Sequence, residues 1–272
     1  MTVREAQATS AAATVMHRRR RIPASDWIVR IASIAVVLGA WQLAGPMLNP
    51  LILRPPSAIF ASFFELIGTG ELQEALWQSL REFVLGLAIA LVLGILIGIL
   101  SGRSRLFYNA TDPLIGALYS VPSVALVPLI AVLFRSFDDP PRITAVALFA
   151  IFPILINTQQ GVRNVDRDLL EVARAFNSSE RRLWTDVIVP SATPFVLAGV
   201  RLAIGRALIG MIIAEFFIGL VGLGYLIIKY ENVFRIDAMF VPVILVSALG
   251  VLMMGFVQWI EGRVAPWLRR EH

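Results

Sequence analysis

The side chains of this chain that could do chemistry are charged or polar groups set within or beside long apolar segments. Arg201, Arg206 and Glu215 lie in one apolar segment, and Asn157 and Gln159 lie near the end of another. A charge in the middle of a membrane costs at least about 2.5–3.5 kcal/mol, so such groups are expected to face a cavity or one another. The sequence therefore predicts Arg206, Glu215, Asn157 and Gln159 as candidate residues of a polar pathway.

A purely structural role is the alternative for each of these groups. Arg201 and Glu215 fall on roughly the same helical face and could pair. Arg206 could contact an anionic solute, or it could extend to the inner interface or pair within the protein, the interpretation favoured for Arg201. Asn157 and Gln159 could gate an inner mouth, although hydrogen bonding at a helix end is the favoured interpretation.

Catalytic chemistry finds little support in the sequence. There is no cysteine, the two histidines are His17 and His272, and neither an HExxH pattern nor a P-loop occurs. We therefore expect no catalytic residue, no metal and no cofactor. Any work driven by ATP would need a separate ATPase.

The elements that must position the polar groups are membrane helices. The chain is 57% hydrophobic and 16% charged, against about 45–50% and about 25% in soluble domains. A helix needs about 20 apolar residues to span the hydrocarbon core. The expected fold class is an all-α integral membrane protein with six spans, at about 27–45, 83–102, 113–134, 143–162, 194–217 and 238–260.

Prolines and glycines are expected to shape these spans. Pro122 and Pro128 should break the third span, and Pro153 lies in the fourth, so both spans should face protein or a pathway. Glycines on one face of the second span let another helix approach closely. They are Gly86, Gly94 and Gly98. A Gly-rich apolar segment after the fifth span, broken at Gly219, Gly222 and Gly224, is too short to cross and should be buried in protein.

Arginine placement predicts the orientation. Arginines cluster before the first span and after the second, fourth and sixth, which puts both termini in the cytoplasm. Residues 1–26 are predicted to form a disordered basic cytoplasmic tail, and residues 27–268 a domain embedded in the lipid bilayer. The net charge of +5 comes from arginines at loop ends, so nucleic acid is not an expected partner.

The loop after the fourth span, residues 163–190, contains a charged segment from Leu169 to Pro190 that we call the island. Its pattern predicts a short helix, a left-handed turn at Asn177, and a second helix capped by Ser178 or Ser179. Pro190 is expected to stop the second helix. Small and bulky apolar residues alternate in the first helix, which suits a surface that fills a partner's groove better than a solvated connector.

The spacing within the island carries a family resemblance. Glu171, Val172 and Ala173 are followed after three residues by Asn177, and after nine more by a Val-Ile-Val-Pro run that ends at Pro190. This pattern resembles the EAA loop of permease subunits of ATP-binding-cassette (ABC) importers, with Asn177 replacing a glycine. Segments such as RPPSAIF, SGRSRLF, VPSVALVPL, GVRLAIGRA and GLGYLI extend the resemblance over residues 53–268, to the branch that serves sulfonates, taurine and nitrate.

The resemblance implies a type I ABC importer permease of MetI-like architecture, with cytoplasmic coupling helices, in the bacterial inner membrane. The implied partners are a dimer of ABC ATPase subunits, a solute-binding protein and a second permease, expected to be an identical copy. The implied coupling residues are Glu171, Ala173, Arg174, Phe176, Asn177 and Pro190. The expected solute is a small anion such as an aliphatic sulfonate, taurine or nitrate. The alternatives are a thiamine-precursor pyrimidine, riboflavin or an aromatic acid, or a secondary transporter, which would carry its own coupling carboxylates.

Overall fold

The computed structural model describes residues 24–47, 49, 52–136 and 138–265, and within them every regular element is helical. The predicted basic tail therefore lies almost wholly outside the described residues. The α-helices are α2 (Ala24–Ala44), α3 (Pro56–Gly68), α4 (Glu71–Arg103), α5 (Arg105–Ser120), α6 (Ser123–Phe134), α7 (Asp139–Arg163), α8 (Arg167–Ala175), α9 (Glu180–Arg182), α10 (Val189–Ile218), α11 (Leu223–Asn232) and α12 (Ile236–Val264). A short 3-10 turn, Gly45–Met47, follows α2, and a π-helical turn, Leu183–Ile188, joins α9 to α10.

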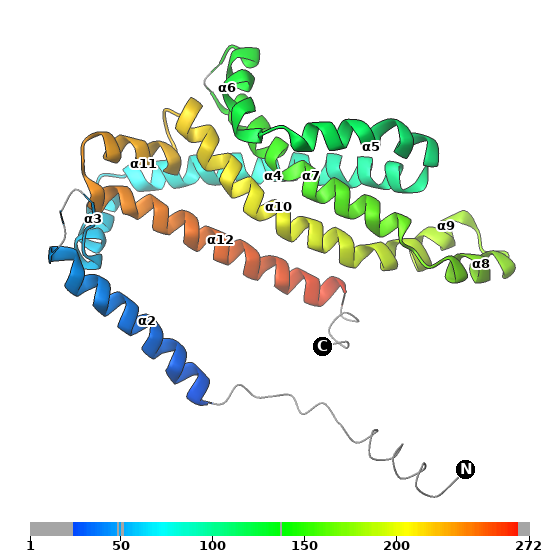
Figure 1. The fold of residues 1–272 in the computed structure, drawn as a ribbon, viewed down its shortest axis with the longest axis horizontal. Helices are drawn as coiled ribbons and strands as arrows, with labels where there is room; N and C mark the ends of the chain where they lie inside the picture. The colour runs from blue at the N-terminus through cyan, green and yellow to red at the C-terminus, as the bar shows by residue number, and fades with distance from the viewer. Residues whose placement is uncertain (1–23, 48, 50–51, 137, 266–272) are drawn as a thin grey trace, which may run out of the picture.

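Five helical stretches of the described chain are long and apolar enough to cross a membrane, and α5 with α6 supplies a sixth if that bent pair is counted as one. The stretches are Trp27–Met47, Glu71–Arg103, Asp139–Arg163, Glu180–Ile218 and Ile236–Val264. α2 stands apart from the other long helices, which lie side by side (Figure 1). Its apolar side chains are exposed, as expected for a helix that faces lipid.

The region of the third expected span is two helices rather than one. The axes of α5 and α6 differ by 97°. Val121, which precedes Pro122, is extended with φ −71° and ψ 131°, the conformation that a following proline favours. Pro128 was expected to break the helix too, but it lies inside α6. It removes only one backbone hydrogen bond, and its buried neighbours Val127 and Ile130 hold α6 against α7 and α10.

The core of the bundle is α7, which packs along α4 on one side and along α10 on the other. The predicted glycine face of α4 is confirmed, and α7 is the helix that approaches it. A Cβ added at Gly86 would lie 2.6 Å from Val146 Cβ, and one added at Gly98 would lie 2.6 Å from Thr158 Cβ. These approaches are closer than any larger side chain allows.

Replacing Gly98 with alanine should therefore destabilise the bundle. The added Cβ would also meet the Leu155 carbonyl oxygen at 2.8 Å, so the backbone of α7 would have to move. Overpacking of this kind costs about 1–3 kcal/mol, which should appear as a lower Tm of the detergent-solubilised protein. Gly255→Ala in α12 is the matched control, because no atom lies within 4 Å of its added Cβ. Equal Tm values for the two variants would contradict the close α4–α7 packing.

One end of the bundle is closed by α3 and α11, which pack on α12 around Leu66, Leu223 and Val241. The glycine-rich segment that was expected to be irregular is broken only at residues 219–222, and Gly224 lies inside α11. Gly222 has φ +124°, which a side chain would disfavour. The predicted burial of this segment holds for Gly222 and Leu223, but Leu220 is 71% exposed.

Ion pairs fasten this closed end. Lys229 and Tyr230 of α11 bind Glu71 of α4. Arg235 donates two hydrogen bonds to the Glu65 carboxylate, at 2.9 and 2.7 Å, and the bonds hold the pKa of Glu65 below its ordinary value. The opposite end of the bundle carries the island, so the two ends differ sharply in character (Figure 1).

Candidate functional site

The island begins with α8, a nine-residue helix that projects beyond the end of the long helices (Figure 1). Asp166 caps its start by accepting a hydrogen bond from the Asp168 backbone at 2.9 Å. Leu169, Val172 and Phe176 are 51%, 53% and 82% exposed, and their spacing of three and four residues puts them on one helical face. An apolar stripe left exposed in the single chain is a candidate surface for a partner.

The other predicted coupling residues lie around this stripe. Glu171 and Arg174 are exposed, and Ala173 is half-buried. Asn177 has φ +53°, which confirms the predicted left-handed turn. The Ser178 backbone N–H donates to the Ala173 carbonyl at 3.0 Å and the Asn177 N–H donates to the Arg174 carbonyl at 2.9 Å, the pair of bonds that defines a Schellman helix end. Ser179 then caps α9, one of the two serines predicted for that role.

The predicted stop at Pro190 is wrong. The chain stays helical without a break from Glu180 to Ile218, through α9, the π-helical turn and α10. Val189 N–H donates to the Trp184 carbonyl, a five-residue step, immediately before Pro190. The missing N–H of Pro190 thus falls where the hydrogen-bond register changes, so the proline ends no helix. The second half of the island is therefore rigidly continuous with α10.

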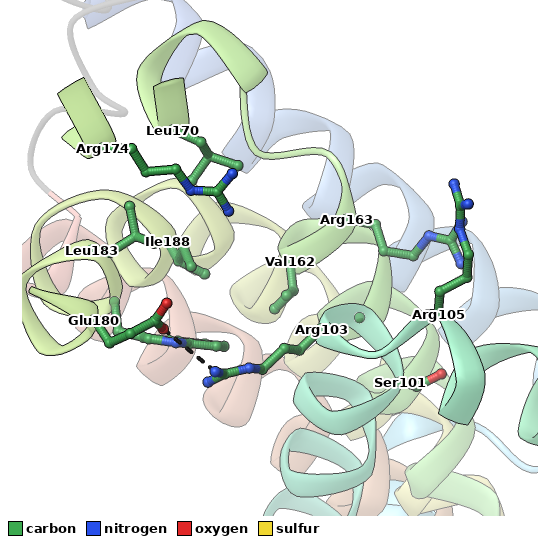
Figure 2. Close-up of a pocket in the computed structure, with 12 residues that line it drawn as sticks. Ser101, Arg103, Arg105, Val162, Arg163, Leu170, Arg174, Glu180, Leu183 and Ile188 are labelled. Atoms are coloured by element: carbon green, nitrogen blue, oxygen red, sulfur yellow. Dashed lines mark hydrogen bonds and ion pairs between the residues drawn. The ribbon is translucent and has the colours of Figure 1, made fainter. Parts of the chain in front are cut away.

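A cavity of about 410 Å³ lies between the island and the ends of α4, α5 and α7 (Figure 2). We call it the basic cavity, because its lining includes four arginines, Arg103, Arg105, Arg163 and Arg174, and one acid, Glu180. Arg103 lies 3.4 Å from Glu180 and stacks over the Trp184 ring at 5.3 Å. Arg163 stacks over the Tyr108 ring at 3.6 Å.

The two arginines of the fifth expected span have different surroundings. Arg201 forms an ion pair with Glu261 of α12, so it has a structural role, but its partner is not Glu215, the residue that the sequence placed on the same face. Arg206, near the middle of α10, is exposed and forms no ion pair with any other described residue. Leu202 and Ile209 on the same face are 59% and 52% exposed. Arg206 is thus available to something outside the single chain.

Glu215 is fully buried and does not pair with Arg201. One carboxylate oxygen accepts a hydrogen bond from the Ser79 hydroxyl, and the other accepts one from the Gly224 N–H at 2.6 Å. Ser79 also accepts from the Leu223 N–H at 2.8 Å. Glu215 and Ser79 thus satisfy the first free N–H groups of α11, which favours a positioning role for Glu215 over a lining role.

Sequence reasoning missed a second buried pair beside this one. Glu82 of α4 and Arg142 of α7 lie 3.1 Å apart with 0% and 6% of their side chains exposed, and Arg142 also donates to the Val221 carbonyl at 3.3 Å. Both residues stand at the margins of apolar segments, so they look like loop charges. Helices α4 and α7 begin at Glu71 and Asp139, several residues before their apolar runs begin. Because of these longer helices, Glu82 and Arg142 lie inside the bundle.

The polar residues near the end of α7 are divided between two surroundings. Asn157 donates to the Pro153 carbonyl at 2.8 Å, a local helix bond. Gln159 is 5% exposed and lines a cavity of about 320 Å³ between α5 and α7. Tyr108, Asp112 and Arg163 line the same cavity.

Among the described residues, no group of three or more acidic or histidine side chains could hold a metal ion.

Comparison with known proteins agrees with this architecture. The chain matches a family described as the binding-protein-dependent transport system inner membrane component, over residues 90–266. It is 34% identical to a putative aliphatic sulfonates transport permease protein of Bacillus subtilis, covering 89% of this chain and 88% of that protein. It is 32% identical to a nitrate import permease protein of Synechocystis sp., covering 94% and 98%. An inward-facing structure of the MetNI methionine ABC transporter shares the fold with a TM-score of 0.56 at 16% identity, covering 72% of this chain and 94% of that one.

A bundle of helices long and apolar enough to cross a membrane is the architecture of a membrane transport subunit. The chain belongs to the family of inner membrane components of binding-protein-dependent transport systems. It is a permease subunit of an ABC importer, and not an enzyme. The predicted MetI-like architecture is confirmed. Such permeases work with an ATPase and a substrate-binding protein.

Proposed function

We propose that this permease carries a small anion, such as an aliphatic sulfonate, taurine or nitrate, delivered by an external binding protein. The observation that carries the proposal is Arg206, an exposed arginine without an ion-pair partner among the described residues, near the middle of a membrane-crossing helix. An unpaired cation at this depth needs a wet cavity or an anion. The sulfonate and nitrate permeases that the chain resembles support the same class of solute.

Uptake into proteoliposomes tests this proposal. The complex of permease, ATPase and binding protein, reconstituted with internal ATP, should accumulate labelled taurine, an alkanesulfonate or nitrate. A thiamine-precursor pyrimidine, riboflavin and an aromatic acid serve as the competing solutes. Accumulation of one of these with no anion uptake would overturn the proposal, and uptake without any ATPase would indicate a secondary transporter.

Two copies of this chain are proposed to form the translocation pathway between them. The exposed face of α10 around Leu202, Gly205 and Arg206 cannot face lipid at low cost, because it presents a charge to the hydrocarbon. A second copy packed against this face would enclose the arginines of both copies in a shared polar space.

Helix α5, which has no buried residue, lies exposed in the single chain as well. Gln159 and Asn157, at the end of α7 toward the island, are proposed to lie near the mouth of this pathway.

The ATPase is proposed to bind the exposed stripe of α8 in the cytoplasm. Glu171, Ala173, Arg174 and Phe176 would contact the partner, while Asn177 fixes the turn and Pro190 marks the junction to α10. Because the chain is helical from Glu180 to Ile218, movement of the island would be transmitted directly to the Arg206 face. Both termini would then lie in the cytoplasm, on the same side as the island.

Single cysteines in this cysteine-free chain test the orientation and the pairing. Phe176→Cys should react with a membrane-impermeant maleimide only after the membrane is opened, whereas Asp138→Cys at the other end should react in intact spheroplasts. Gly205→Cys, whose added Cβ meets no atom within 4 Å, should form a disulfide between two copies under mild oxidation. Reversed labelling would contradict the orientation. Failure of Gly205→Cys to cross-link in the assembled complex would contradict the identical pair.

A further inference from the structure

The basic cavity adjoins a second, apolar hollow that runs toward the middle of the bundle. This apolar groove has a volume of about 290 Å³ and lies between α4, α7, α10 and α12. Val162, Trp184 and Ile188 line both hollows, so the two share a wall. Along α4 the lining passes from Arg103 in the basic cavity to Ile99 and Ile95 in the groove. The polar part thus lies at the helix ends and the apolar part along the spans.

The charges of the basic cavity are unbalanced within the chain. Its arginines come from four different helices, Arg103 from α4, Arg105 from α5, Arg163 from α7 and Arg174 from α8, and Glu180 is the sole acidic residue of the lining (Figure 2). Arg103 pairs with that glutamate. The other three form no ion pair with a described residue, and the side chains of Arg105 and Arg163 lie together on one side of the cavity (Figure 2). Neighbouring arginines without acidic partners attract a multivalent anion, with phosphate oxygens the best geometric match.

We propose that the two hollows together bind one anionic phospholipid, with its phosphate headgroup in the basic cavity and an acyl chain in the apolar groove. Trp184 lines both hollows at their junction, and tryptophan is enriched where headgroups meet acyl chains. Basic pockets between membrane helices on the cytoplasmic side are known recognition sites for such headgroups. The lipid would bridge α8 and the π-helical turn to the ends of α4 and α7, and so brace the island.

A free phosphate or a small anion would account for the arginines alone. A small anion would leave the apolar groove beside the cavity empty. The almost wholly apolar lining of that groove is suited to an acyl chain. A segment of the ATPase is the other candidate occupant, but the groove runs between helices long and apolar enough to cross a membrane, and its apolar lining suits an acyl chain better than a polar protein segment. The lipid site depends on the proposed function in one respect, because the orientation of the chain decides which leaflet supplies the lipid. It does not depend on which solute the permease carries.

Lipid titration followed by native mass spectrometry tests the headgroup half of the site. The assembled importer, delipidated in detergent, is titrated with phosphatidylglycerol and separately with phosphatidylcholine. The intact complex should bind phosphatidylglycerol more tightly. Arg105→Gln with Arg163→Gln should weaken that binding about 30-fold, on the basis of the usual contribution of a basic residue near a lipid surface. Arg181→Gln with Arg182→Gln, which makes the same charge change on exposed island residues outside the cavity, should leave it unchanged.

A groove-filling variant tests the acyl-chain half. Val196→Trp places a large side chain in the groove, away from the arginines. It should weaken phosphatidylglycerol binding by about tenfold or more, because the indole would keep several methylenes of the acyl chain out of their apolar surroundings. The headgroup site at Arg105 and Arg163 would stay intact.

Three results would overturn the proposal. The first is equal weakening of lipid binding by the two double-arginine variants. The second is binding of glycerol 3-phosphate or inorganic phosphate as tightly as the lipid, unaffected by Val196→Trp, which would indicate a small-anion site. The third is loss of the ATPase from the Arg105 and Arg163 variant with lipid binding unchanged, which would assign the cavity to the ATPase. Because none of these readouts involves transport, a failed lipid site and a failed solute assignment remain distinguishable.

Discussion

Replacement of Arg206 by alanine is expected to reduce solute uptake about 10- to 100-fold while leaving the complex assembled. The arginine is exposed near the middle of α10 and has no ion-pair partner among the described residues, so its charge is free to bind a passing anion. A hydrogen bond to a charged group is worth about 1.5–3 kcal/mol, which sets the size of the loss. Uptake of labelled anion by proteoliposomes, at matched amounts of assembled complex, is the measurement.

Two further variants separate the charge from the fold. Arg206→Lys keeps the charge and should retain part of the uptake, although lysine cannot bind an oxyanion in a bidentate manner. Val251→Ala, which truncates an apolar side chain that is 73% exposed on α12, should have little effect. Wild-type anion uptake by Arg206→Ala, with normal assembly, would remove Arg206 from the pathway.

Aspartate in the exposed stripe of α8 is expected to detach the ATPase. Val172 and Phe176 are 53% and 82% exposed in the single chain, so both apolar side chains are available to the ATPase. Val172→Asp with Phe176→Asp would therefore put two unpaired charges into an apolar interface. Substituting one of the few dominant residues of an interface costs about 2 kcal/mol or more, so the ATPase should bind at least about 30-fold more weakly. Ala173→Asp, beside the stripe, should at least uncouple ATP hydrolysis from uptake while insertion remains normal. Retention of the ATPase on affinity-purified permease measures the loss.

Val233→Asp is the matched control for the stripe. Val233 is 58% exposed, close to the value for Val172, but it lies at the closed end of the bundle beside α11. The variant should retain the ATPase fully. If Val233→Asp and the α8 double variant lost the ATPase to the same extent, the loss would reflect general instability rather than docking.

Local rules were sufficient for several parts of the structure. The glycines of α4 were predictable because a helical face without side chains has one common use in a membrane, the close approach of another helix. The turn at Asn177 was predictable because asparagine tolerates a left-handed backbone. In both cases a short stretch of sequence determines the outcome, and no distant residue is needed.

A local change of hydrogen-bond register and the contacts between distant residues were not predictable. Pro190 ends no helix, because the π-helical turn before it changes the hydrogen-bond register. Glu215 and Ser79 hold the start of α11, a contact between residues 136 positions apart. Glu82 and Arg142 meet only because α4 and α7 extend past their apolar runs. Local patterns carry no information about the last two contacts, since each joins residues on different helices that are far apart in the sequence.

Disulfide cross-linking between the island and the ATPase tests most directly whether α8 is the docking helix. The permease contains no cysteine, so Phe176→Cys gives a single reactive thiol in the exposed stripe of α8. A set of single cysteines is placed along the groove of a cysteine-free ATPase, and Asp138→Cys at the closed end of the permease serves as the control. We predict a strong cross-link from Phe176→Cys to one part of the ATPase, reduced or enhanced by nucleotide, and none from Asp138→Cys. An assembled complex that hydrolyses ATP but gives no cross-link from Phe176→Cys at any ATPase position would contradict docking through α8.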